Sequence, residues 1–168
     1  MKYFLVLFAS FLIPSIAHAA ADLGITASDI RFSETVLVSG DLVRMYAKIH
    51  NVGDEDVSGY VTFYQGSNLV DDSLVISLPA DGDPDEVYVD FIVPNSTFNI
   101  LAIIQGTDPA DINSSNDTAL TATFKPIVDD DRDGVENASD NCASSSNTNQ
   151  LDSDGDGQGD TCDTDDDN

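Results

Sequence analysis

The sequence predicts an all-β protein in which an antiparallel β-sandwich is followed by an irregular, acidic tail. Apolar and polar residues alternate through residues 22–125, as they do in half-buried strands. Turn-forming residues recur at intervals of roughly ten residues, and no helical stripe is present. From residue 129 onward aspartate dominates and apolar residues become scarce, so a segment of different construction begins there.

Alternation and turns together delimit the individual strands. In the second candidate strand Val43, Met45 and Ala47 alternate with larger or polar residues. Short strands separated by regular turns favour a sandwich, and a domain of about 100 residues can bury enough surface to fold alone. The predicted strands span residues 23–30, 42–50, 60–64, 73–78, 86–93, 98–104 and 119–124.

The order of these turns and strands resembles a known family. Gly40-Asp41 opens an alternating strand that ends in His50-Asn51-Val52-Gly53, and Asp108-Pro109 precedes a polar loop before the last strand. Over residues 22–124 this order resembles the bacterial cell-adhesion-related domain known as CARDB, an immunoglobulin-like sandwich. The family usually has more acidic residues in the loop that spans residues 111–115 here. The resemblance implies the fold and transfers no functional residue.

Residues 1–19 have the features of an export signal. Lys2 provides the positive charge, residues 3–13 are almost wholly apolar, and Ala17-His18-Ala19 is a small-x-small cleavage site. We expect cleavage before Ala20, and the alternative is an uncleaved membrane anchor. No later stretch approaches the ~20 apolar residues of a membrane-spanning helix. The sequence therefore predicts a secreted, periplasmic or cell-surface protein without membrane insertion after cleavage.

The charge of the chain restricts its partners. The formal net charge is −25, with 31 acidic and 6 basic residues. Nucleic acid binding requires Lys and Arg to displace counterions, so this chain repels nucleic acid and attracts cations. Fourteen acidic residues lie within residues 129–168, where Arg132 is the only base. We therefore divide the chain into a signal peptide (1–19), a sandwich (20–125) and a tail (126–168), with a hinge at Pro126-Ile127-Val128.

The tail contains two copies of one spacing. Each places oxygen-bearing side chains at positions 1, 3, 5, 9 and 12 with glycine at position 6, which is the ligand pattern of an EF-hand-type calcium loop. Glycine permits the turn that points the position-7 carbonyl inward. The first loop offers Asp129, Asp131, Asp133, the carbonyl of Val135, Asn137 and Asp140, and the second offers Asp152, Asp154, Asp156, the carbonyl of Gln158, Asp160 and Asp163; Asp163, Asp165 and Asp167 begin an incomplete third copy.

Ca²⁺ is the ion that this pattern predicts. Mg²⁺ prefers fewer protein ligands, and Zn²⁺ is disfavoured because no histidine lies in the tail. The alternative is a solvated acidic tail, but two full patterns with both glycines in place argue against it. Cys142 and Cys162 are the only cysteines, and an even count in an exported protein suggests a disulfide, with free thiols as the alternative.

The residues around the loops exclude flanking amphipathic helices of the EF-hand type. The string from Asp140-Asn141-Cys142 to Gly159-Asp160-x-Cys162-Asp163 instead resembles the thrombospondin type 3 repeat, and the resemblance covers residues 129–168. In that family the chain wraps around calcium ions and neighbouring cysteines pair, so the resemblance implies an irregular, calcium-wrapped tail. Two departures are Ala143, where the family commonly has proline, and Asn137, which replaces an aspartate.

These patterns predict an exported, calcium-binding structural or adhesion protein of the cell envelope or extracellular space. We expect its partners to be calcium ions and another envelope or extracellular protein or a glycan. We expect no enzyme, because no histidine is placed to act as a base and no nucleophile-elbow or phosphate-loop pattern occurs. The alternative is a carbohydrate- or peptide-binding accessory module of a larger secreted enzyme or envelope anchor. An exposed aromatic strip formed by Tyr60, Tyr64 and Tyr88 would favour that alternative.

Overall fold

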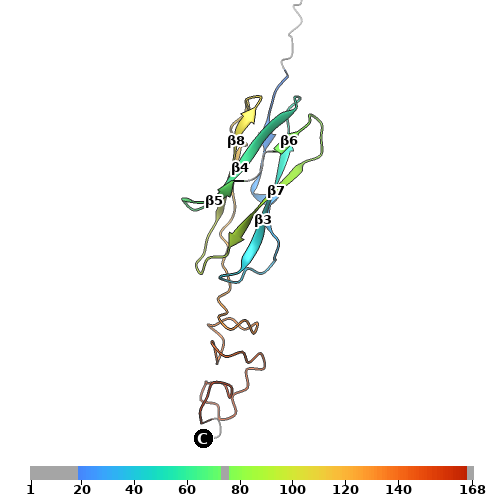
Figure 1. The fold of residues 1–168 in the computed structure, drawn as a ribbon. Coiled ribbons are helices and arrows are strands. Elements are labelled where there is room, and N and C mark those ends of the chain that lie inside the picture. Colours follow the sequence, from blue (N-terminus) through green and yellow to red (C-terminus); the bar gives the residue numbers. More distant parts are fainter. Residues whose placement is uncertain (1–18, 73–75, 166–168) are drawn as a thin grey trace, which may run out of the picture.

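The computed structural model describes residues 19–72 and 76–165. Two layers of antiparallel strands form an elongated sandwich, and the tail extends from one end of it (Figure 1). The signal sequence predicted for residues 1–19 falls almost entirely outside the described residues, as does Asp167. No helix among the described residues is long and apolar enough to cross a membrane.

The first sheet is built around β3 (Leu42–Asn51), with which the other strands of this sheet all pair. The long strand β7 (Asp85–Ile92) lies along one side of β3, in a register that places Tyr46 opposite Tyr88. The short strands β1 (Leu23–Gly24) and β2 (Ile30–Phe32) pair with β3 as well, and the 3-10 helix η1 (Ala27–Asp29) joins them.

The second sheet contains the remaining strands. Its central pair is β4 (Val57–Gln65) and β8 (Ile100–Asp108), and β9 (Thr118–Leu120) pairs with β8. The strands β5 (Asn68–Asp72) and β6 (Ile76–Leu78) both pair with β4. All of these pairings are antiparallel, which confirms the predicted sandwich of antiparallel sheets.

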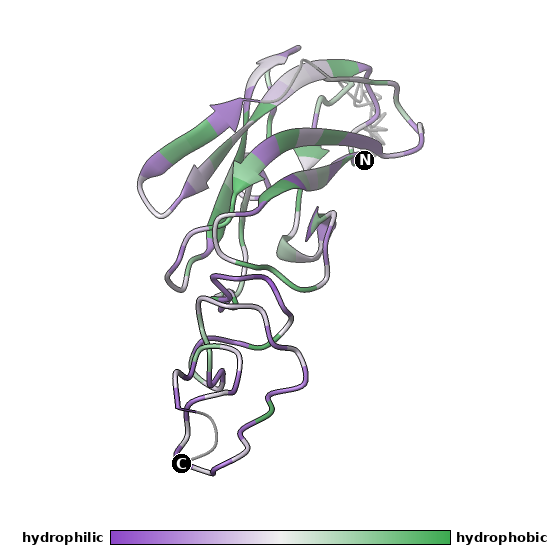
Figure 2. Ribbon diagram, turned by 60° about the horizontal axis from the view of Figure 1, so that its bottom comes forward, coloured by the Kyte–Doolittle hydropathy of each residue, from purple (hydrophilic) through white to green (hydrophobic). Residues whose placement is uncertain are grey.

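Alternate residues of the strands fill the space between the sheets. On β3 the side chains of Val43, Met45 and Ala47 are buried, whereas Leu42, Arg44 and Lys48 on the other face are exposed. The same alternation on β7 and β8 completes a single apolar core. Burial of these alternate apolar side chains supplies the main driving force for folding of the sandwich. Figure 2 shows that hydrophobic residues concentrate in the sandwich, whereas the tail is mainly hydrophilic.

Two predicted strands are interrupted or shortened in the structure, and residues 73–75 of the strand predicted at 73–78 lie outside the described residues. Residues 23–30 are interrupted, because Thr26 and Asp29 form a capping box that starts η1 between β1 and β2. The segment predicted at 119–124 ends its strand at Leu120 and then meets Phe98 through a single bridge at Phe124. The edge strand β5 was not predicted, since its mostly exposed residues carry no apolar alternation.

The end of the sandwich that faces the tail is closed by aromatic rings. The rings of Phe32 and Phe124 meet edge-on at 5.2 Å between centroids, and Phe98 lies 5.4 Å from Phe124. Pro126 is buried directly after this cluster. Pro126, the first of the three residues that we expected to act as a hinge, is therefore packed at the end of the sandwich from which the tail departs.

Candidate metal centre

The two predicted loops, residues 129–140 and 152–163, adopt the same backbone arrangement. At position 1 of the first loop, Asp129 accepts hydrogen bonds from the amides of Arg132 at 2.7 Å and Gly134 at 3.0 Å. One carboxylate thereby ties together the first turn of the loop. In the second loop Asp152 accepts equivalent bonds from Gly155 at 2.7 Å and Gly157 at 3.0 Å.

Positions 3 and 5 each use one carboxylate oxygen to stabilise the loop itself. Asp131 accepts from the amide of Asp133 at 3.2 Å, and Asp133 accepts from the amide of Val135 at 2.8 Å. Such Asx turns bring alternate carboxylates to one side of the chain. As a result, carboxylate oxygens of the three aspartates at positions 1, 3 and 5 lie within 4.8 Å of one another in each loop. The second loop repeats these bonds from Asp156 to Asp154 at 3.1 Å and from Gln158 to Asp156 at 2.7 Å.

Left-handed backbone occurs at the same two positions of both loops. The glycines at position 6 have φ of 95° at Gly134 and 99° at Gly157, so the glycine requirement read from the sequence has a conformational cause. Position 4 is also left-handed, with φ of 61° at Arg132 and 80° at Gly155. A side chain in this conformation costs roughly 1–2 kcal/mol, so an arginine at this position needs a compensating contact.

The carboxylate at position 12 joins the first cluster. Among the described residues, the Oδ2 atoms of Asp131 and Asp140 are both buried without a hydrogen-bond partner. Burial together with repulsion from Asp133 and Asp140 raises the pKa of Asp131, even though the amide of Asp133 lowers it. An unpaired buried carboxylate oxygen is costly, and a cation placed between these oxygens would remove that cost.

Asp163 has the corresponding place in the second loop. The amide of Asp156 lowers the pKa of Asp154, but burial and repulsion from Asp156 and Asp163 outweigh it, so that pKa is raised. Asp163 also accepts hydrogen bonds from the amide of Asp165 at 3.1 Å and from the side-chain amide of Gln158 at 3.2 Å. The second cluster is the more open of the two, since Asp156 is exposed.

The side chains at position 9 have a role that the sequence pattern did not indicate. Asn137 accepts a hydrogen bond from the amide of Asp130 at 2.9 Å, which closes the first loop back on its start. Asp160 closes the second loop by accepting from the amide and hydroxyl of Ser153, each at 2.7 Å. The neutral and the charged side chain thus make the same backbone contact.

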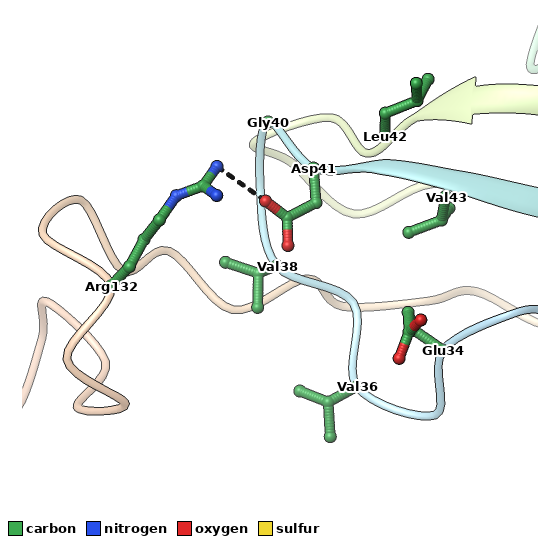
Figure 3. Close-up of a pocket in the computed structure, with 8 residues that line it drawn as sticks. All are labelled: Glu34, Val36, Val38, Gly40, Asp41, Leu42, Val43 and Arg132. Carbon is green, nitrogen blue, oxygen red and sulfur yellow. Dashed lines mark ion pairs between the residues drawn. The ribbon is translucent and has the colours of Figure 1, made fainter.

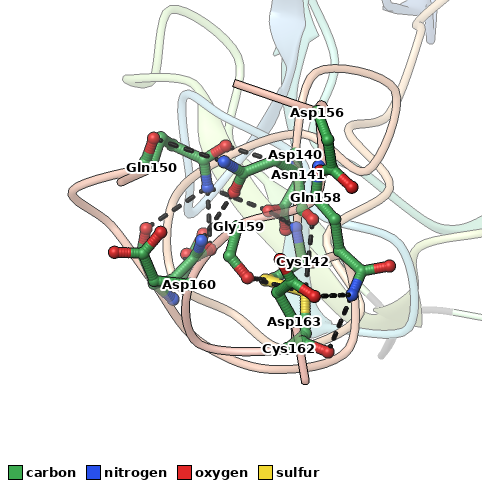
Figure 4. The surroundings of a disulfide bond; sticks show 12 residues. Asp140, Asn141, Cys142, Gln150, Asp156, Gln158, Gly159, Asp160, Cys162 and Asp163 are labelled. Atoms are coloured by element: carbon green, nitrogen blue, oxygen red, sulfur yellow. Dashed lines mark hydrogen bonds between the residues drawn. A yellow bond between two sulfur atoms is a disulfide. The ribbon is translucent and has the colours of Figure 1, made fainter. Parts of the chain in front are cut away.

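Cys142 and Cys162 form the disulfide that the sequence suggested, with their Cα atoms 5.7 Å apart. Figure 4 shows the surrounding polar side chains. Gly159 passes so close to this region that an added Cβ would lie 2.5 Å from Oδ1 of Asn141. The glycine is required here by close approach, since its neighbours include buried polar atoms of Asn147.

Three amide side chains replace an apolar core inside the tail. Gln150 donates from Nε2 to Asp140 and to Asn147, both at 2.8 Å, and Asn147 donates from Nδ2 to Asn141 at 2.6 Å. The backbone amide of Asn147 donates to Oδ2 of Asp133 at 2.8 Å. This amide network (Asn141, Asn147 and Gln150) therefore joins the first loop to the disulfide-bonded half of the tail. All three residues lie within the string that resembles the thrombospondin type 3 repeat, but no local pattern in it predicts this network.

A separate group of carboxylates lies on the sandwich. Asp111 accepts from the backbone amide of Leu23 at 2.7 Å, and Asp22 accepts from the side chain of Asn116 at 2.8 Å. Asp117 Oδ1 is buried without a partner among the described residues. Burial, with repulsion from Asp111 and Asp22, raises the pKa of Asp117 to about 6.

The tyrosines named as a possible aromatic strip do not lie together. Tyr60 and Tyr64 belong to β4 in one sheet, whereas Tyr88 belongs to β7 in the other. Tyr88 pairs with Tyr46 at 6.1 Å between ring centroids, and the guanidinium of Arg44 covers Tyr88 at 4.1 Å. Tyr60, Tyr64 and Tyr88 therefore give no support to the accessory-module alternative.

Comparisons with known proteins identify the sandwich. No family model matches the chain, and no curated protein matches it. The chain is similar to the crystal structure of a CARDB domain from Pyrococcus furiosus in complex with di-metal ions. The likeness covers 66% of this chain and 96% of that domain, with a TM-score of 0.52 and 19% sequence identity. The solution NMR structure of the same domain covers 66% and 97%, with a TM-score of 0.50 and 20% identity. This likeness confirms the predicted immunoglobulin-like fold.

Proposed function

We propose that the tail binds Ca²⁺ in its two loops and that the bound ions hold the tail in its folded form. The observation that carries this proposal is the pair of buried oxygens, Oδ2 of Asp131 and of Asp140, which have no hydrogen-bond partner among the described residues. Both belong to predicted ligands of one loop. Burying an unpaired carboxylate oxygen costs free energy of folding. A cation is the partner that would satisfy both Oδ2 atoms at once.

The chemistry of the clusters favours calcium among divalent cations. Each cluster holds three carboxylates whose oxygens lie within 4.8 Å of one another, and we expect positions 7 and 12 to add further oxygens. Oxygen ligands suit hard cations, and Ca²⁺ accepts roughly six to eight of them in flexible geometry. Val135, Gln158, Asn137 and Asp160 remain predicted ligands, the last two through whatever lone pairs their loop-closing bonds leave free. Asp165 and Asp167 remain predicted ligands of an incomplete third site.

The role of the whole chain follows from combining this tail with the sandwich. We propose an exported structural or adhesion protein of the envelope or extracellular space, with a cleaved signal (1–19), a CARDB-like sandwich (20–125) and a thrombospondin type 3-like tail (126–168). Extracellular calcium would stiffen the tail into a stalk or docking segment. The sandwich would meet an envelope or extracellular protein or a glycan, and we expect no catalysis from either part.

A second cation site on the sandwich is favoured by one further observation. The similar domain from Pyrococcus furiosus was crystallised in complex with di-metal ions. In this chain burial, followed by repulsion from the carboxylates of Asp111 and Asp22, raises the pKa of Asp117. Calcium titration of an Asp117→Asn variant tests this site separately from the tail.

Calorimetric titration and amide hydrogen exchange of the exported chain test the main proposal. We expect binding on the order of 10⁻⁴ to 10⁻³ M, as in extracellular modules, with slower exchange in residues 129–163 when Ca²⁺ is present. Asp131→Asn should remove the effect in the first loop and Asp154→Asn in the second. Asp81→Asn makes the same charge change in a turn of the sandwich and serves as the control. Absence of heat at millimolar Ca²⁺, or equal protection with and without EDTA, would contradict the proposal.

A further inference from the structure

The two loops differ at one structurally equivalent position, and the difference points toward the sandwich. Arg132 and Gly155 both occupy position 4 with left-handed backbone. Glycine adopts this conformation freely, whereas arginine does so at a cost of roughly 1–2 kcal/mol. The arginine side chain makes a contact that its counterpart cannot make, an ion pair from Nη2 to Oδ1 of Asp41 at 2.7 Å.

Asp41 lies in the segment of the sandwich that also holds the start of the tail. Ser39 donates its amide hydrogen to the carbonyl of Ile127 at 2.8 Å, and Ile127 donates to the carbonyl of Leu37 at 2.8 Å. These bonds form a parallel bridge between Val38 and Ile127. Residues 37–41, which we call the docking segment, therefore contact the tail both through its backbone and through Arg132.

Arg132 and Asp41 both line an open groove between the first loop and the sandwich. The groove has a volume of about 530 Å³ and is lined on the sandwich side by residues such as Glu34, Val36 and Leu42. Figure 3 shows the side chain of Arg132 directed toward Asp41, with the ion pair between them. Of the described residues that line the groove, Arg132 alone comes from the tail. Besides Arg132, the bridge at Ile127 and a longer ion pair from Lys125 to Glu136, at 3.9 Å, connect the first loop to the sandwich.

The ion pair alone is too weak to hold this orientation. The side chains of Arg132 and Asp41 are 66% and 34% exposed, and ion pairs between exposed groups contribute about 0–1 kcal/mol. Asp131 and Asp133 flank the arginine, and without a cation their mutual repulsion disfavours the loop backbone that directs Arg132 toward Asp41. A cation between these carboxylates fixes the backbone on both sides of Arg132, so the ion pair then forms with less loss of conformational freedom.

We propose that Arg132 is a positioning residue through which cation binding in the first loop docks the tail onto the docking segment. This inference rests on the proposed calcium binding and deepens it. The loaded first loop presents Arg132 to Asp41, and the ion pair stabilises the bridge at Ile127. By reciprocity, the contact with Asp41 favours the cation-bound form of the first loop and leaves the second loop unaffected.

Amide exchange rates of Ser39 and Ile127, measured by NMR on the exported chain with Ca²⁺ or with EDTA, test the inference. In the unmodified chain we expect Ca²⁺ to slow both amides at least about fivefold, the lower end of typical coupling between sites. Arg132→Asn keeps a residue that tolerates left-handed backbone but removes the ion pair. It should abolish the slowing at Ser39 and Ile127 while the loop amides remain protected by Ca²⁺.

Asp41→Asn repeats the test from outside the tail, in case Arg132→Asn disturbs the first loop. It should give the same loss at Ser39 and Ile127. Asp90→Asn is the matched control, because Asp90 pairs with Arg44 at 3.3 Å and makes the same change in charge; the calcium effect should persist in it. Protected loops with equal slowing in all variants would overturn the inference and leave the proposed function intact. Absence of calcium protection in the loops themselves would overturn both.

Discussion

The sandwich and the tail are held together by different interactions within one chain. Between the two sheets the fully buried side chains are apolar, and Phe63 and Met45 are among the largest. Among residues 129–165, Cys142 is the one buried apolar side chain, and the buried side chain of Asn147 is an amide. The tail is stabilised by a disulfide, an amide network and carboxylates that accept backbone hydrogen bonds. The two parts should therefore respond to different perturbations.

The largest effect should come from opening the apolar core. Phe63 has no exposed surface, so Phe63→Ala should lower the free energy of unfolding of the sandwich by about 3–5 kcal/mol, through lost transfer energy and a cavity. Urea denaturation followed by circular dichroism measures it. Leu69→Ala, at an exposed site on β5, is the control and should change little. Equal loss in both variants would mean that the core is not the main source of stability.

Removing the disulfide should affect the tail alone. The cysteines are separated by 20 positions, and the chain-entropy model gives roughly 3 kcal/mol for closing a loop of that size. Cys142→Ser with Cys162→Ser should therefore speed exchange of the amides in residues 140–163, while the melting of the sandwich stays unchanged. Parallel loss of sandwich stability would show that the two parts unfold as one unit.

The carboxylate of Asp117 should make the stability of the sandwich depend on pH. Because the folded chain raises the pKa of Asp117 to about 6, the folded state binds its proton more tightly than the unfolded state. Stability should fall as the pH rises from about 4 to above 6. Asp117→Asn should then be more stable by about 1–2 kcal/mol at pH 7, after allowance for solvent screening, and no more stable at pH 4.

Urea denaturation in EDTA at both pH values measures the contribution of Asp117, with Asp81→Asn as the control for charge in an exposed turn. A gain of the same size at pH 4 and pH 7 would contradict the electrostatic explanation. A gain that disappears when Ca²⁺ replaces EDTA at pH 7 would support the second cation site proposed for the sandwich.

The smallest effect concerns the difference between the two loops. The sequence predicts that the second loop binds calcium more tightly, because Asp160 carries a charge where Asn137 does not. Both side chains make the same loop-closing bond, so Asn137→Asp should fold normally and strengthen the first loop by less than about 1.4 kcal/mol, or tenfold. Calcium titration followed by the amide signals of each loop measures this change. Weaker binding in the variant would mean that the amide itself is required.

The sequence by itself determined the features that depend on neighbouring residues. Alternation along residues 42–50 and 86–93 determines which side chains of β3 and β7 are buried, since successive side chains of a strand point to opposite faces. In the tail, glycine at position 6 and aspartates at alternate positions determine the loop backbone. Gly134 and Gly157 have left-handed backbone there, which glycine adopts without strain. The cysteine count likewise sufficed to suggest the disulfide.

Tertiary structure decided the contacts between residues that are far apart along the chain. No local pattern indicates that Asn147 binds Asp133 or that Arg132 reaches Asp41. It also decided that Pro126 and Ile127 are anchored, because the burial of Pro126 and the bridge from Ile127 to Val38 need the sandwich beside them. Local periodicity specifies which face of an element is buried. Only the packing of the sheets and the path of the tail specify which distant residues that face will meet.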